Sequence, residues 1–156
     1  MTSNLVITII MAIVALYGAA LSTYNAIQQR KEKKPSIKVS QGIGMITDAM
    51  GGLSDAMIVL TAANTGHIPV TLASAGLFLP NSQQMIFPPL ALNVRFPYEL
   101  VPGKSCRIYR EATSIVKSIK EQQYNGKIDV VVFFQDEVGN TYKSKKTKLD
   151  LDGWKA

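Results

Sequence analysis

The sequence predicts a mainly β domain preceded by a single N-terminal transmembrane helix, and three observations support this fold class. The first 29 residues carry no charged side chain. The remainder consists mostly of short apolar runs broken by Gly, Pro, Asn and Asp, as in strands joined by turns. Within it, residues 111–123 show the period of a helix. A length of 156 residues suits one folded domain, which we place at residues 37–154.

The predicted transmembrane helix covers residues 5–27, which are mostly Ile, Val, Ala, Leu and Met. A helix of this length reaches about 34 Å and therefore crosses a hydrocarbon core of roughly 30 Å. A secretory signal would need basic residues before a shorter apolar run, although the small residues of "GAALS" keep it as an alternative. A buried helix of a soluble protein would need a polar face, and this segment has few polar side chains.

Residues 28–36 form a predicted basic juxtamembrane linker, with Pro35 ending any helix. It contains Arg30, Lys31, Lys33 and Lys34. Basic residues beside a span tend to stay in the cytoplasm, where anionic lipid head groups attract them. We therefore expect a single-pass protein of the bacterial inner membrane, with its N-terminus outside, its C-terminal domain in the cytoplasm and its flank on anionic lipid.

Two other roles are conceivable for the basic residues, and the span has a further feature. A nucleic-acid contact is disfavoured because no aromatic residue lies among the basic ones, and a bare solvated hinge is the remaining alternative. In the span, Ala15, Ala19 and Thr23 form a row of small residues that would let helices approach closely. A homo-oligomer through the span is thus a further expectation.

The first strands follow directly after the linker. The run "PSIKVSQ" alternates, whereas "AMIVLTAA" and "IPVTLASAGLFL" are apolar on both faces, as in central strands. Asn64 and Gly66 in "NTGHIP" suit a tight turn, so we expect a hairpin between these two runs. Five prolines between residues 80 and 102 predict only short edge strands there.

The second half predicts one helix and a final hairpin. A short amphipathic helix is indicated by Ala112, Ile115, Val116 and Ile119 on one face, with Glu111 at its positive N-terminal end. The hairpin pairs "KIDVVVFFQ" with "TYKSKKTKLDL" across the turn "DEVGN". Its expected buried face comprises Ile128, Val130, Val132 and Phe134. Four lysines on the returning strand, Lys143, Lys145, Lys146 and Lys148, predict an exposed edge that resists strand pairing or, alternatively, binds lipid or acidic groups.

About seven short strands with one interrupting helix fit an immunoglobulin-like β-sandwich, and a small β-barrel is the alternative. Tyr124, just before the last hairpin, is a candidate tyrosine corner whose hydroxyl would bind nearby backbone. The segments "LTAANTGHIPVTLASAGLFLP", "FPYELVPGKSC", "FQDEVGNTYKSKK" and "DLDGW" resemble an uncharacterised family of small bacterial single-span membrane proteins with such a domain. The resemblance covers residues 55–154 and implies a fold rather than an activity.

The chain offers little catalytic chemistry. His67 is the single histidine and is interpreted as a loop residue, while Cys106, the single cysteine, is expected to fill a buried strand position. The glycines of residues 41–57 match neither a dinucleotide nor a P-loop pattern, and we expect no cofactor, no metal site and no catalytic residue. The same segment is instead a possible contact loop, with Met45, Met50, Gly51 and Gly52 as its soft apolar and flexible residues.

These observations favour a membrane-anchored, non-enzymatic module that binds an unknown protein partner through a sheet edge or this loop. The alternative is a membrane-bound sensor or effector that binds a small anionic ligand and oligomerises through its span. An enzyme that uses His67 or Cys106 is the third hypothesis.

Overall fold

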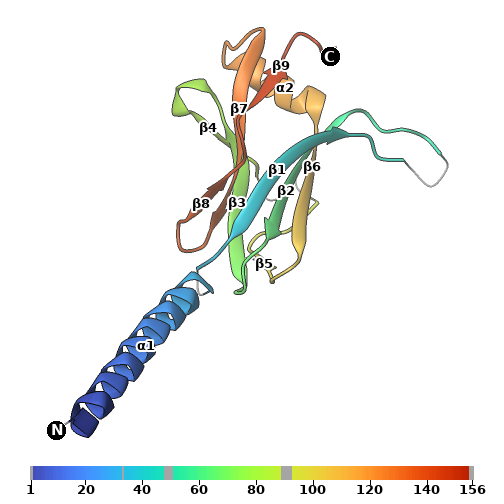
Figure 1. Cartoon of the computed structure of the whole chain (residues 1–156). Coiled ribbons are helices and arrows are strands. Elements are labelled where there is room, and N and C mark those ends of the chain that lie inside the picture. Colours follow the sequence, from blue (N-terminus) through green and yellow to red (C-terminus); the bar gives the residue numbers. More distant parts are fainter. Residues whose placement is uncertain (1, 33, 48–50, 89–92, 155–156) are drawn as a thin grey trace. The chain divides into compact units, whose positions relative to one another are not determined.

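The computed structural model describes residues 2–32, 34–47, 51–88 and 93–154. The chain divides into two compact units, Met1–Lys34 and Pro35–Ala156. The first contains the helix α1 and the second contains all the strands and the helix α2 (Figure 1). The predicted fold class, mainly β with one short helix after an N-terminal helix, is confirmed.

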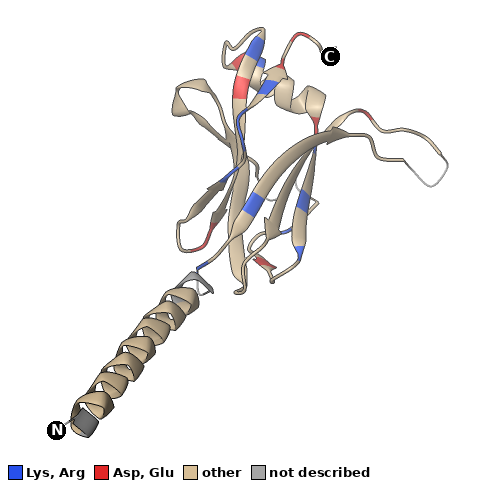
Figure 2. Cartoon of the chain, in the orientation of Figure 1, with Lys and Arg blue, Asp and Glu red and all other residues tan. Residues whose placement is uncertain are grey.

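Helix α1 covers Thr2–Glu32, so the span predicted at residues 5–27 lies inside it. Its segment Asn4–Gln29 is long and apolar enough to cross a membrane. Figure 2 shows most of this helix free of Lys, Arg, Asp and Glu. The hydroxyl groups of Thr8 and Thr23 donate to carbonyl oxygens one turn earlier, at 2.8 and 2.9 Å. These bonds satisfy polar side chains that hydrocarbon could not solvate. The helix enters the predicted linker because Gln, Arg, Lys and Glu are good helix formers.

The second unit contains two antiparallel sheets, and Figure 1 shows α2 across one end of them. One sheet has the order β1-β2-β6, formed by Ile37–Gly44, Met57–Asn64 and Ser105–Glu111. In the other, β3 (Val70–Phe78) pairs with β7 (Lys127–Asp136) on one side and with β4 (Gln84–Ile86) and β5 (Tyr98–Leu100) on the other. The strands β8 (Thr141–Lys143) and β9 (Thr147–Asp150) pair with β7, and a short 3-10 helix, Pro80–Ser82, follows β3.

The core lies between these sheets and is built from alternating strand residues. In β2 every second side chain is buried, including Leu60, which is fully enclosed. Leu72 of β3, Ile108 of β6 and Phe134 of β7 are fully enclosed as well. Burial of such side chains contributes about 1.5–3 kcal/mol each and is the main stabilising term of the domain.

The predicted hairpin at "NTGHIP" is wrong, because β2 and β3 belong to different sheets. The turn instead carries the chain from one sheet to the other. Asn64 is buried in it, and its Nδ2 donates to the carbonyl oxygens of Ile68 and Leu100 at 2.8 Å each, while its Oδ1 accepts from the Gly66 amide at 3.0 Å. Asn and Gly favour a tight turn, but a turn can precede a sheet change as readily as a hairpin.

Helix α2 covers Ala112–Glu121, and its predicted apolar face is confirmed: Ala112, Ile115, Val116 and Ile119 are all buried. The Glu111 carboxylate at its start accepts hydrogen bonds from the Ser114 hydroxyl at 2.6 Å and the Thr113 hydroxyl at 2.9 Å. These bonds, the Ser114 bond first, lower the pKa of Glu111. The charged carboxylate is therefore favoured where the helix dipole is positive.

The final hairpin is confirmed with one modification. The predicted face of β7 is buried, but the returning strand is interrupted at Ser144 and forms β8 and β9. Ser144 fills the interruption, since its amide donates to the Val132 carbonyl oxygen at 2.9 Å and its Oγ accepts from the Val132 amide at 3.0 Å. The four lysines of the returning strand lie at the edge of the sheet, as expected, because β8 and β9 pair with β7 on one side only among the described residues.

Tyr124 takes a role that differs from the predicted local tyrosine corner. Its hydroxyl donates to the carbonyl oxygen of Pro80, 44 residues earlier, at 2.9 Å. The same hydroxyl lies 2.8 Å from Gln83 Oε1. The residue therefore connects the loop before β7 with the segment after β3.

The turn after β7 is organised by Asp136, whose two carboxylate oxygens accept from both nitrogens of Asn140 and from the Tyr142 hydroxyl at 2.7–2.9 Å. Burial alone would raise the pKa of Asp136, but these hydrogen bonds outweigh it and lower the pKa. For Tyr142, burial and then the bond to Asp136 raise the pKa to about 12. The sequence motif "DEVGN" is thus a turn closed by its own side chains.

A Tyr142→Phe variant is expected to lose less stability at alkaline pH than the wild type. Because the folded state raises the pKa of Tyr142, its contribution is complete below the unfolded pKa near 10 and is lost as the pH rises toward about 12. Chemical denaturation at pH about 9 and about 11 should show an extra loss of up to about 1 kcal/mol in the wild type. Tyr98→Phe, in β5, is the matched control; equal alkaline losses in all three proteins would contradict the prediction.

Candidate functional site

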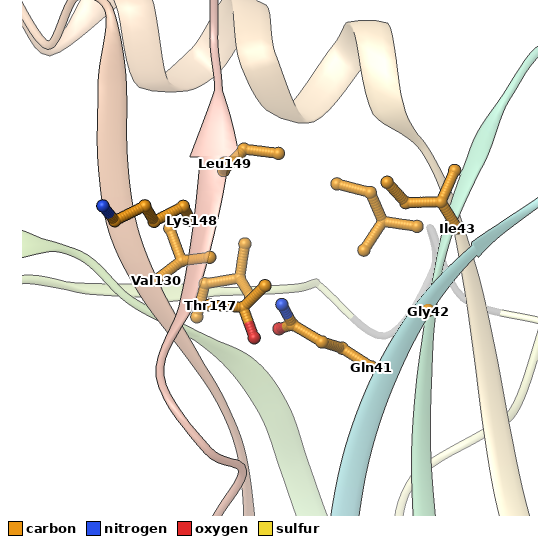
Figure 3. Close-up of a pocket in the computed structure, with 9 residues that line it drawn as sticks. Gln41, Gly42, Ile43, Val130, Thr147, Lys148 and Leu149 are labelled. Atoms are coloured by element: carbon orange, nitrogen blue, oxygen red, sulfur yellow. The ribbon is translucent and has the colours of Figure 1, made fainter.

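A small cavity opens between the two sheets at the side where β1 and β9 face each other (Figure 3). Its volume is about 220 Å³ and its walls are mostly apolar. We call it the slot and define it by Gln41, Ile43, Ile58, Val130, Thr147 and Leu149, which line it from four strands. In Figure 3 the Gln41 side chain projects from β1 toward Thr147 of β9.

At the slot the two sheets leave core-facing residues of β1 uncovered. Val39, Gln41 and Ile43 point to the same face of β1, since side chains alternate along a strand. Val39 is buried, but Ile43 is 66% exposed although its register partner, Ile58 of β2, is only 6% exposed. Ile43 is therefore a core-facing apolar side chain without a layer over it.

The same holds on the other wall of the slot. Thr147 and Leu149 share a face of β9, and their partners in β7, Val130 and Ile128, are both buried core residues. Leu149 is buried, whereas Thr147 is exposed. A core position on each sheet is thus left open at the same end of the sandwich.

One polar atom in the slot lacks a partner. The Oε1 of Gln41 is buried and has no hydrogen-bond partner among the described residues. An unsatisfied buried acceptor costs about 1–3 kcal/mol, so it favours a group that can donate to it. A peptide backbone offers both N–H and C=O groups, so it can bind the Gln41 carboxamide whichever of its two end atoms, oxygen or nitrogen, faces the slot.

A basic strip follows β8, β9 and the residues between them, and it meets the slot at Lys148. It comprises Lys143, Lys145, Lys146 and Lys148. Within the described residues, Lys146 alone of these four forms an ion pair, with Asp129 at 3.0 Å. The ammonium group of Lys143 lies 4.4 Å from the centre of the Phe78 ring. Asp150 of β9 is paired with Lys127 at 3.5 Å, so three of the four lysines have no carboxylate partner among the described residues and leave this edge positive.

The predicted contact loop connects β1 and β2 and starts directly beyond the slot. Met45, Gly51 and Gly52 are exposed, while Met50 lies outside the described residues. The loop prolongs the hairpin through a bridge between Thr47 and Leu53 and a 2.8 Å bond from the Ser54 amide to the Ile46 carbonyl oxygen. Met45, Ile46 and Leu53 give it exposed apolar surface.

The predicted membrane flank is described in part. Arg30 and Lys31 lie in the last turn of α1, but their side chains are outside the description, and Lys33 is outside it entirely. Lys34 is exposed. Arg30 and Lys31 therefore continue the apolar helix by its last turn.

The two candidate catalytic side chains do not meet. Cys106 is 2% exposed in β6 opposite Ala62, and burial raises the pKa of its thiol to about 11, which disfavours the reactive thiolate. His67 is exposed in the turn that joins β2 to β3. Among the described residues, no group of three or more His, Cys, Asp or Glu could hold a metal ion.

Sequence reasoning missed the slot residues Gln41, Ile43 and Thr147. The sequence predicts a loop over residues 41–57, whereas the structure places Gln41 and Ile43 in β1. Ile43 and Thr147, on the two walls of the slot, are also more than a hundred residues apart in the chain. A polar residue, Gln41, at a core-facing position of β1 was the signal that could have indicated an incomplete core.

Comparisons with known proteins add no functional information. No protein family model and no curated protein matches the chain. A solved structure with some likeness is the X-ray structure of Northeast Structural Genomics Consortium target SoR45, at 13% identity over 74% of this chain and 86% of that chain. Its TM-score is 0.35, a value too low to support an argument about fold or function.

Proposed function

We propose that this protein is a membrane-anchored, non-enzymatic interaction module whose domain binds another protein at the cytoplasmic face of a bacterial inner membrane. The observation that carries the proposal is the slot, an unfilled core position at a sheet edge, in a chain that also has a helix of spanning length. A partner side chain in the slot would complete the apolar layer over Ile43 and remove its large exposed apolar surface from water.

The orientation follows from charge. Residues 1–29 contain no basic side chain, whereas Arg30, Lys31, Lys33 and Lys34 follow the apolar residues. The membrane potential and anionic inner-leaflet lipids both favour keeping these residues in the cytoplasm. Their second role would be to hold the end of the span against anionic head groups.

We extend the proposal to the fold type and family. The sheet orders β1-β2-β6 and β4-β3-β7-β8 are those expected of an immunoglobulin-like sandwich in which α2 joins β6 to β7. This order supports the resemblance to small bacterial single-span proteins with such a domain. It supports no activity, because the fold serves mainly as a scaffold for contacts of many kinds.

A small anionic ligand is a weaker occupant of the slot. Sites for small molecules are typically about 300–1,000 Å³, and this cavity is about 220 Å³ with mostly apolar walls. The lysines lie on its border rather than inside it, apart from the stem of Lys148. The size and polarity favour one or two apolar side chains of a protein.

Fusion of alkaline phosphatase after Ala156 is expected to be inactive, and a green fluorescent protein fusion at the same point is expected to fluoresce. The reason is that the phosphatase matures only in an oxidising compartment. Replacing Arg30, Lys31, Lys33 and Lys34 together with Glu should give phosphatase activity in a substantial fraction of molecules. The same four replacements at Lys143, Lys145, Lys146 and Lys148 are the control, because those residues are remote from the span in sequence. High activity of the unaltered fusion would overturn the orientation.

Chemical cross-linking at native expression, followed by purification from solubilised membranes, tests the interaction itself. We expect a defined second protein to be recovered with the full chain and lost when the Pro35–Ala156 domain is deleted while α1 is retained. Recovery of the protein alone, or of the same proteins with α1 by itself, would refute the proposed function.

A further inference from the structure

We infer that the slot receives an extended, acidic peptide segment of a partner protein, which adds as a strand at the β9 edge and inserts apolar side chains between the sheets. This inference rests on the proposed function and names the partner's chemistry. It depends on three properties of the same place: an open core layer, free strand edges and an excess of positive charge.

The open core layer requires apolar side chains at strand spacing. Ile43 on one wall and Thr147 on the other both face the core and are both exposed. Side chains two residues apart on an extended chain point to the same side, about 6.5–7 Å from each other. The slot-facing side chains of a bound strand would therefore pack between Ile43 on one wall and Thr147 on the other.

The free edges of the strands favour a peptide over a lipid chain as the occupant of the slot. β9 pairs with β7 through one edge, and β1 pairs with β2 through one edge, so each has a second edge that faces the slot side of the sandwich. Backbone N–H and C=O groups on such an edge bind an added strand. An acyl chain could fill an apolar slot, but it has no group to bind these edges or the unpartnered Gln41 Oε1.

The positive charge selects an acidic segment. Lys148 alternates with the slot-facing Thr147 and Leu149, and although its stem lines the slot, its ammonium nitrogen points away from it (Figure 3). Its register partner Asp129 is already bound to Lys146 at 3.0 Å. Lys145 and Lys148 form no ion pair within the part of the chain that the structure describes. Opposite charges on neighbouring strands stabilise the pair, and like charges destabilise it. The outward side chains of the bound segment should therefore be Asp or Glu.

The probe for this inference is the labelled peptide Asp-Val-Glu-Ile-Asp-Val-Glu, titrated into the full chain in phosphatidylcholine nanodiscs and followed by fluorescence anisotropy. Two companion peptides separate the required properties. In one, every acidic residue is Lys; in the other, alternate backbone nitrogens are methylated, so that one edge cannot donate hydrogen bonds. We expect each change to weaken binding at least about tenfold, because each removes charge pairing or edge bonding.

Ile43→Glu is the first protein variant, since this exposed residue can be changed without opening the core and the new charge repels the peptide. It should weaken binding at least about tenfold. Ile46→Glu is the matched control, because Ile46 is also exposed in the same hairpin but lies outside the slot, and its affinity should change less than about twofold. Thr147→Phe, which fills the slot from the opposite wall, should weaken binding as strongly as Ile43→Glu.

Hydrogen exchange locates the bound peptide. Amides of Thr147–Asp150 that do not bond to β7 should exchange at least about tenfold more slowly when the peptide is present. Equal binding of the lysine peptide, equal binding of the methylated peptide, or equal weakening by Ile43→Glu and Ile46→Glu would overturn the inference. A concentration-dependent dimer that Thr147→Phe dissociates would also overturn it, because a second copy would then be the occupant.

The outcome is separable from that of the proposed function. If cross-linking recovers the same partner with the wild type and with Ile43→Glu, the module binds a partner through another surface and only the inference fails. If no partner is recovered and the acidic peptide does not bind, both fail.

Discussion

Replacing Gly76 with alanine is expected to reduce the free energy of unfolding by about 3 kcal/mol or more, because there is no room for a methyl group at this position. Gly76 lies in the centre of β3, opposite Ile86 of β4 and Phe133 of β7. A Cβ at this position would overlap the carbonyl oxygen of Met85 and approach the Phe133 ring to 2.9 Å. Because β3 is paired on both sides, the backbone cannot move away from one contact without breaking the other.

Thermal unfolding of the full chain in detergent measures the effect, which should be a decrease in Tm of about 10 °C. Gly42→Ala is the matched control: it also places a methyl group in a strand, yet a Cβ there has no heavy atom within 4 Å. Its Tm should change by less than about 2 °C. Similar melting of both variants would mean that β4 does not pack on β3 as described.

Replacing Asn64 with alanine is expected to cost about 2–4 kcal/mol, the second largest effect. Asn64 is 2% exposed and makes three hydrogen bonds across the turn that changes sheets, to Ile68, Leu100 and Gly66. Alanine would leave the buried carbonyl oxygen of Leu100 without the Nδ2 donor. Loss of a partner to a buried group costs more than the hydrogen bond itself contributes.

Two further variants test whether the lost hydrogen bonds of Asn64, rather than any substitution in this turn, cause the loss of stability. Asn64→Asp keeps the shape of the side chain but has no N–H group, so at neutral pH it should be at least as destabilising as alanine. Thr65→Ala changes the next residue, whose hydroxyl binds Ser36 at the exposed side of the same turn, and should cost less than about 1 kcal/mol. Chemical denaturation gives all three values. If Asn64→Asp is as stable as the wild type, the hydrogen bonds that Nδ2 donates are not what stabilises the turn between the two sheets.

Local patterns predicted the elements whose residues are neighbours in sequence. The spacing of Ala112, Ile115, Val116 and Ile119 predicted α2 and its buried face. The alternation from Ile128 to Phe134 predicted β7 and its core face in the same way. Such patterns succeed because periodicity reports which side of an element is apolar, and burial of that side is what stabilises the element.

The sequence by itself determined an uncharged helix of spanning length, a basic flank, a mainly β domain and a lysine-rich outer strand. The tertiary structure decided which strands pair, because turns such as the one at Asn64 and Gly66 suit several connections and strand pairing is selected by distant contacts. It also decided the candidate site. Ile43 alternates with Val39 as a core residue does, and it is exposed only because the opposite sheet leaves its end of β1 uncovered.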